Sequence, residues 1–177
     1  TFQGEETIHI RVMEPTSEIL LNAVEIKVRS VILSRNGART ATTQISYDVA
    51  RETLTLSFGE TIPVGEADLE IEFAGELNDK LRGFYRSEYT DGQGVLKRLA
   101  TTQFEPTDAR RAFPCWDEPA KKATFEVTLV FSDEYQAVSN TPVVEEAVPG
   151  PGLKSVRFAE TPVMSTYLLA FIVGNLT

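Results

Sequence analysis

The strongest constraint on the fold is an alternation of apolar and polar side chains with a period of two residues. It occurs in at least three segments of the first half of the chain, at residues 8–12, 24–28 and 67–73. Successive side chains of a strand point to opposite faces, so this period predicts strands with one buried face. No helical period of ten residues or more is found, and we therefore expect an all-β protein.

Short turn signals separate the expected strands. Asn36-Gly37 lies between two β-rich runs and predicts a type I′ hairpin turn, in which both central residues have positive φ. Asp91-Gly92 predicts a second tight turn, and the Pro- and Gly-rich run at 148–152 predicts an exposed hairpin tip. Frequent turns between short strands are typical of an antiparallel sandwich.

The segment that follows Gln103 has a different character. Its composition does not suit a long strand, and Pro114 and Pro119 prevent a long helix, so a single helical turn or an irregular corner fits best. We therefore expect one domain over residues 1–177. It should be a curved antiparallel β-sandwich, or a pair of saddle-like sheets, with at most a short helical turn near residues 106–112.

Composition restricts the possible partners and the compartment. The net charge is −9, from 17 basic and 26 acidic residues, and no stripe of Lys and Arg is present, which argues against nucleic-acid binding. No apolar run approaches the length of about 18 residues that suggests a membrane span. Cys115 is the only cysteine, so no internal disulfide can form, which favours a cytoplasmic location. Cys115 is expected to be a small buried residue.

The residues needed for hydrolysis are not found in any familiar pattern. His9 is the only histidine and lies on the polar side of a strand pattern, so a histidine-pair zinc site cannot form and a surface position is expected. The run 91–94, Asp-Gly-Gln-Gly, lacks the Lys and helix of a phosphate-binding loop and is interpreted as a turn. We therefore predict no catalytic residue and no metal site in this chain.

One short stretch offers a binding function. On a strand, Gln103 and Glu105 point to the same face, whereas Phe104 points into the opposite layer. A carboxylate beside an amide oxygen suits an ammonium group, such as the free N-terminus of a peptide. From spacing alone, a solvated polar strand face explains the same residues.

A family resemblance bears on this choice. The stretch TTQFEPTDARRAFPCWDEPAKKATF, residues 101–125, closely resembles the signature of the N-terminal domain of the zinc aminopeptidase N family, which includes puromycin-sensitive aminopeptidases. Further segments similar to that family occur in its order, namely FQGEETIHI, LNAVEIKV, GFYRSEY, SNTPV and MSTYLLAFIVGN. The resemblance implies a curved antiparallel β-structure packed against a thermolysin-like catalytic domain.

The same resemblance implies roles for individual residues. Glu105 would bind the α-ammonium group of a peptide substrate, and Gln103 would line the pocket for its first side chain. The ligands for Zn²⁺, an H-E-x-x-H motif with a more distant Glu, do not occur here. We therefore expect the chain to be part of a longer enzyme, with the zinc-binding catalytic domain elsewhere in the same protein, and to be inactive alone. An exposed apolar patch is expected where that domain would dock.

Two alternative functions remain open at this point. A non-catalytic interaction or scaffold domain would use the same fold in a relative that had lost its zinc site. An unrelated adhesion-type β-sandwich would leave the ordered motifs unexplained. The charged residues of the signature are first interpreted structurally, as ion pairs that hold the corner; they are Arg110, Arg111, Asp117 and Glu118.

Overall fold

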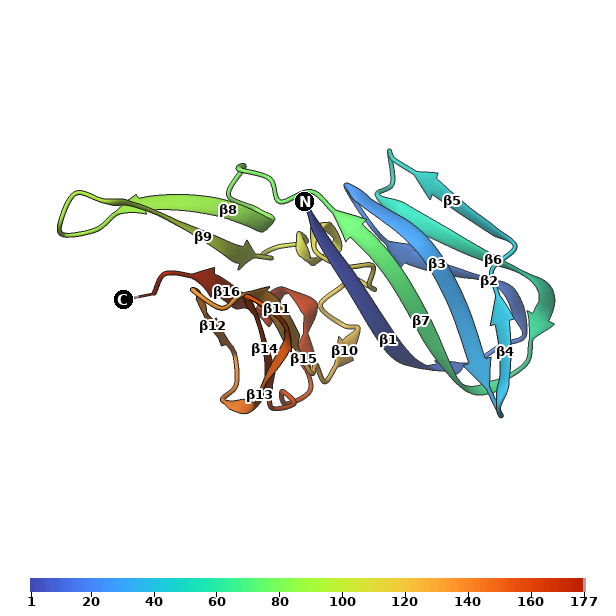
Figure 1. Cartoon of the computed structure of the whole chain (residues 1–177). Coiled ribbons are helices and arrows are strands. Elements are labelled where there is room, and N and C mark those ends of the chain that lie inside the picture. Colours follow the sequence, from blue (N-terminus) through green and yellow to red (C-terminus); the bar gives the residue numbers. More distant parts are fainter. Residues whose placement is uncertain (177) are drawn as a thin grey trace. The chain divides into compact units, whose positions relative to one another are not determined.

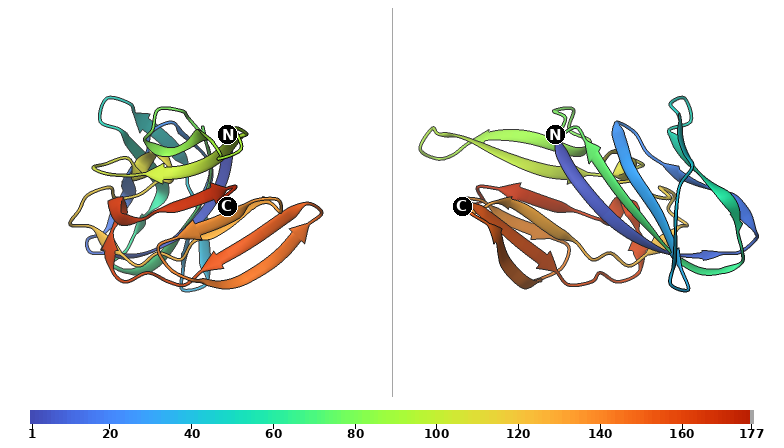
Figure 2. Two further views of the ribbon diagram at one scale, coloured as in Figure 1. Left: turned by 90° about the vertical axis from the view of Figure 1, so that its left-hand side faces the viewer. Right: turned by 45° about the vertical axis from the view of Figure 1, so that its right-hand side comes forward.

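The computed structural model describes residues 1–176 and is built almost entirely of strands (Figures 1 and 2). Within these residues there are sixteen strands and two short 3-10 helices, and every pair of named strands is antiparallel. The predicted all-β antiparallel class is confirmed. No helix in this part of the chain is long and apolar enough to cross a membrane.

The chain forms two compact units. Unit 1 consists of Thr1–Glu76 and Arg110–Trp116, and unit 2 consists of Leu77–Ala109 and the chain from Asp117 onward. The chain therefore leaves unit 1, builds the first part of unit 2, and returns to unit 1 for seven residues. Whether the two units act as the single domain expected over 1–177 stays a prediction.

Unit 1 is a sandwich of two sheets. Its strands are β1 (Phe2–Val12), β2 (Thr16–Asn22), β3 (Ile26–Arg35), β4 (Ala38–Ala41), β5 (Gln44–Asp48), β6 (Thr53–Ile62) and β7 (Gly65–Gly75). One sheet has the order β1-β7-β3-β4 and the other β2-β6-β5 (Figure 1). Leu54 and Leu56 of one sheet and Leu69 and Ile71 of the other are almost fully buried in one core. For Leu69 and Ile71, the period of two residues predicted this burial.

One residue on the core side of β1 does not fit the apolar pattern. Glu6 pairs with Ile71 of β7, and its Oε1 atom is fully buried with no hydrogen-bond partner among the described residues. Burial raises the pKa of the Glu6 carboxyl well above its ordinary value, because desolvation disfavours the charged form. Glu6 itself is half-buried, so one carboxyl oxygen without a hydrogen-bond partner lies buried on the core side of β1.

The strands of unit 2 are β8 (Gly83–Thr90), β9 (Leu96–Gln103), β10 (Lys122–Ala123), β11 (Thr128–Ser132), β12 (Gln136–Ser139), β13 (Val143–Gly150), β14 (Leu153–Phe158), β15 (Met164–Ser165) and β16 (Phe171–Gly174). They form three sheets, with the orders β12-β16-β9-β8, β11-β14-β13 and β10-β15. Phe131, Val156 and Phe158 are buried between the first two, where Ala137 and Val173 pack against them. The two 3-10 helices are η1 (Ala109–Arg111) and η2 (Thr166–Leu168).

The turns largely follow the predictions. Asn36 and Gly37 have φ of 48° and 80°, which confirms the type I′ turn between β3 and β4. The 148–152 run forms the predicted exposed hairpin tip, between β13 and β14. The β8–β9 turn is longer than expected, because the Asp91 carboxylate accepts hydrogen bonds from the backbone N–H groups of Gln93 and Val95.

Some details differ from the prediction. The sequence patterns do not predict β2, β10 or β13, and the β-rich run after Asn36-Gly37 is divided into β4 and β5. The run TFEVTLVF, residues 124–131, is rich in β-branched and aromatic residues and predicts a strand, but β11 begins only at Thr128. The run STYLLAFIV, residues 165–173, also predicts a strand. It is interrupted by η2, because Ser165 donates a hydrogen bond to the Pro119 carbonyl and Thr166 donates one to Asp117. At these residues, side-chain hydrogen bonds replace the backbone hydrogen bonds that a strand would make.

Candidate functional site

The two predicted binding residues lie on either side of a buried phenylalanine. Gln103 is the last residue of β9, and Glu105 begins the turn that follows. Both are exposed, whereas Phe104 between them is only 2% exposed. The Gln103 amide nitrogen also lies 3.5 Å from the Glu105 carbonyl oxygen. The two side chains are thus exposed at the end of β9, but Glu105 lies in the turn and not, as the spacing predicted, on the strand.

The anchor for this arrangement is a group of aromatic rings in unit 2. The ring of Phe104 lies 6.1 Å from that of Phe171, and the ring of Phe84 lies 5.1 Å from Phe171, both edge-on. Such edge-on pairs stabilise a core beyond the area that they bury. Phe104 is therefore fixed from the interior, which holds its two polar neighbours at the surface.

The turn after Glu105 is closed by a hydrogen bond from the Asp108 N–H to the Phe104 carbonyl, 2.8 Å long. η1 follows directly, so the short helical turn predicted near residues 106–112 is confirmed. The chain then enters unit 1, where Val24 donates a backbone hydrogen bond to Arg110, and Asn22 and Cys115 exchange two. Cys115 is buried, as predicted.

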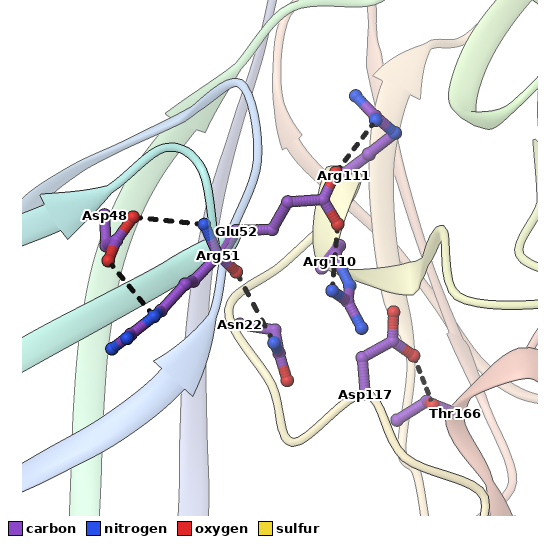
Figure 3. Close-up of polar contacts among 8 residues, drawn as sticks. All are labelled: Asn22, Asp48, Arg51, Glu52, Arg110, Arg111, Asp117 and Thr166. Atoms are coloured by element: carbon purple, nitrogen blue, oxygen red, sulfur yellow. Dashed lines mark hydrogen bonds and ion pairs between the residues drawn. The ribbon is translucent and has the colours of Figure 1, made fainter.

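Arg110 and Arg111 hold the segment Arg110–Trp116 in unit 1 through acidic partners that could not be identified from the sequence. Glu52 accepts an ion pair from Arg110 at 2.9 Å, and Arg111 lies 3.3 Å from Glu25 and 3.6 Å from Glu52. Figure 3 shows the Glu52 carboxylate between the two guanidinium groups. Glu25 and Glu52 both have φ of 57°, a conformation that is uncommon for residues other than glycine. The structural role predicted for the two arginines is confirmed.

Asp117 begins the next stretch of unit 2 and is also structural. It is 2% exposed and accepts a 2.7 Å hydrogen bond from the Thr166 hydroxyl (Figure 3). His9, by contrast, is exposed on β1, and its Nδ1 lies 2.7 Å from Asp68, so the predicted surface position is confirmed.

The described residues do not fit a zinc ion. No group of three or more His, Cys, Asp or Glu side chains within 1–176 is arranged to hold a metal. A zinc site requires three or four such ligands at about 2.0–2.3 Å.

Comparison with known proteins identifies a family. The model of the Peptidase M1 N-terminal domain matches residues 1–168, which include parts of both units. Aminopeptidase M1-A of Oryza sativa subsp. japonica is 48% identical over 98% of this chain and 20% of its own length. Puromycin-sensitive aminopeptidase of Caenorhabditis elegans is 43% identical over 99% of this chain and 19% of its own length.

A bacterial relative shows the same likeness. Aminopeptidase N of Acetobacter pasteurianus is 42% identical over 98% of this chain and 48% of its own length. The chain thus spans about a fifth of the plant and nematode relatives and about half of the bacterial one. The family resemblance predicted from the sequence is confirmed: the chain belongs to the Peptidase M1 N-terminal domain family.

Proposed function

We propose that this chain is the substrate-anchoring domain of a zinc-dependent aminopeptidase, and that Glu105 binds the free α-amino group of a peptide substrate. The observation that carries the proposal is the exposed pair Gln103 and Glu105, held at the surface by buried Phe104. The names of the similar proteins, all aminopeptidases, support the reaction class.

The chemistry follows from charge and geometry. The Glu105 carboxylate attracts an ammonium group, and the Gln103 amide oxygen is a second acceptor beside it. A peptide chain that continued past this point would have no ammonium to offer and would leave the carboxylate unpaired, so the site favours a free N-terminus. This is the selectivity of an exopeptidase.

Hydrolysis itself would depend on other parts of the longer protein. A zinc ion polarises a carbonyl group and activates water, and in this proposal its ligands lie outside this chain, which alone would be inactive. In this proposal, Gln103 and Glu105 bind and orient the amino terminus of the substrate.

The experiment is to compare Glu105→Ala and Glu105→Gln with wild type in the full-length protein, using aminoacyl substrates. Losing a charge-assisted contact costs about 1.5–3 kcal/mol, which corresponds to a fall in kcat/KM of about ten- to a hundredfold. Glu118→Ala is the matched control, since Glu118 is also exposed in the same signature stretch and should change kcat/KM little. Normal kcat/KM in both Glu105 variants would refute the proposed role.

A full-length protein without peptidase activity would favour the scaffold alternative.

A further inference from the structure

The turn between β3 and β4 exposes an asparagine amide directly before a glycine. Asn36 and Gly37 are both exposed, with φ of 48° and 80°, and the two strands pair up to Arg35 and Ala38 on either side. Neither the Asn36 side chain nor the Gly37 N–H makes a hydrogen bond within residues 1–176. A side-chain amide and the backbone nitrogen that follows it are therefore both unrestrained.

The surroundings of this turn also leave room for the two groups to meet. A Cβ atom placed on Gly37 would lie within 4 Å of nothing, so the space around this residue is open. Glycine has no side chain to block an approach, and its backbone reaches more conformations than that of any other residue. Exposed tips of loops are the segments that open with the least free energy. The Gly37 nitrogen can therefore reach the Asn36 side chain without disturbing the core of unit 1.

The reaction of such a pair requires only water. Asparagine is a thermolabile residue, because the next backbone nitrogen can lose its proton and attack the side-chain carbon Cγ. A C–N bond forms, and the side-chain nitrogen leaves as ammonia with that proton. Water then opens the resulting succinimide ring at one of its two carbonyl groups. One opening gives aspartate, and the other gives isoaspartate, in which the main chain runs through Cβ and Cγ.

The other asparagines do not meet these conditions. Asn36 is the only asparagine in the sequence that precedes a glycine. The Asn140 side chain donates a hydrogen bond to the Leu168 carbonyl and accepts one from the Ala170 N–H. Asn78 is 7% exposed, and its side chain is hydrogen-bonded to the backbone. These amides are held away from the backbone nitrogen that follows them.

Asp91-Gly92 is a related pair that the structure restrains. An aspartate before a glycine forms the same ring with loss of water. Hydrogen bonds from the backbone N–H groups of Val95 and Gln93 lower the pKa of the Asp91 carboxyl below its ordinary value and keep it ionised. An ionised, hydrogen-bonded carboxylate is a poor target for a backbone nitrogen. The contrast with Asn36 depends on the structure, since both residues precede a glycine.

We infer that Asn36 is a site of spontaneous deamidation, and that its isoaspartate product releases β4 from β3. A two-residue type I′ turn matches the twist of the strands that it joins. Isoaspartate adds one carbon atom to the main chain of the turn and removes that match. β4 has four residues, all exposed, and among the described strands it pairs only with β3. The register of β4 therefore depends on this turn.

The side chains of β4 add little that would hold it in place. Arg39 donates two hydrogen bonds, 2.9 and 2.7 Å long, to the Glu70 carboxylate on β7. The Arg39 side chain is 57% exposed and that of Glu70 is 34% exposed. Ion pairs this exposed are screened by solvent and stabilise a fold weakly. Loss of the turn geometry is therefore expected to free β4 and to break this pair.

The test stores the full-length protein at physiological temperature and mildly alkaline pH, and follows each asparagine by peptide mass spectrometry. Asn36 should gain the mass of an amide converted to an acid, with isoaspartate among the products, whereas Asn78 and Asn140 should not. A synthetic peptide of residues 32–40 is the unfolded reference, and the folded protein should react within about tenfold of its rate. A lower rate than that, or equal gains at Asn36 and Asn140, overturns the inference.

Hydrogen exchange tests the effect on β4. The β4 amides should exchange faster in the isoaspartate form than in fresh wild type. Fresh Asn36→Asp is the matched control and should exchange like wild type, because Asp-Gly also suits a type I′ turn. Stored Asn36→Gly keeps a suitable turn without the amide and should show neither the mass gain nor the faster exchange. Unchanged β4 exchange in the isoaspartate form overturns the proposed release.

Discussion

Arg110 and Glu52 form an ion pair with 2.9 Å between Nη1 and Oε2, although they are far apart in the sequence. Only 11% of the Arg110 side chain is exposed, and Glu52 also contacts Arg111, of which 8% is exposed. Removing Glu52 would leave both guanidinium groups with less compensation, so we expect Glu52→Ala to lower the free energy of unfolding by about 1–3 kcal/mol. Denaturant unfolding of the whole chain measures this.

The backbone at this position provides a control. Glu52 has positive φ, which glycine adopts without strain, so Glu52→Gly loses the same carboxylate but relieves the backbone. Glu52→Gly should therefore be less destabilising than Glu52→Ala. Equal losses in the two variants would mean that the backbone conformation contributes nothing.

Glu6 should make stability depend on pH. Burial raises the pKa of its carboxyl in the folded state, so between about pH 4.3, the ordinary value for glutamate, and the raised pKa the unfolded chain releases its proton while the folded chain keeps it. The stability contribution of Glu6 is thus highest at acid pH and decreases as pH rises through this window. Glu6→Gln, which cannot ionise, should be more stable than wild type at pH 8 by about 1 kcal/mol.

The neighbouring residue serves as the control for this effect. Glu5 is exposed on the opposite side of β1. Thermal unfolding across pH 4–8 should give a smaller pH dependence for Glu6→Gln than for wild type, and Glu5→Gln should follow wild type. A wild-type pH dependence in Glu6→Gln would exclude Glu6 as its source.

Gly174 allows a close approach of β16 to β9. A Cβ atom at this position would lie 2.6 Å from Leu99 Cβ and 3.0 Å from the Arg98 carbonyl oxygen, so Gly174→Ala should separate the strands and cost about 1–3 kcal/mol. Gly92→Ala is the control, because a Cβ there meets nothing within 4 Å. Hydrogen exchange of the β9 amides should accelerate in Gly174→Ala alone. If both variants unfold at the same denaturant concentration, the contact is unimportant.

Strands with one buried face could be predicted from the sequence, because their burial leaves a period of two. β1 and β7 show it directly, with alternate residues turned into the core of unit 1. β13 leaves no such mark, since seven of its eight residues are exposed. The interruption at Thr166 could not be predicted either, because it depends on a hydrogen bond to Asp117, a distant residue.

Some features of the candidate site and its surroundings could likewise be predicted from the sequence, and others could not. The exposure of Gln103 and Glu105 could be predicted, because they flank an aromatic residue that must be buried. The length of the β8–β9 turn could not be predicted, because the carboxylate of Asp91 sets a turn longer than Asp91-Gly92 suggests. The acidic partners of Arg111 lie in two loops far away in sequence, which no local pattern reveals.

The central claim is that Glu105 binds the amino group of the substrate. The most direct measurement removes the amino group from the ligand and, separately, the carboxylate from the protein. Inhibition constants of leucine amide and of its analogue without the amino group should be measured on the full-length protein, in wild type and in Glu105→Ala. We expect wild type to prefer leucine amide, and Glu105→Ala to reduce that preference by about ten- to a hundredfold. An equal preference in both proteins would contradict the claim.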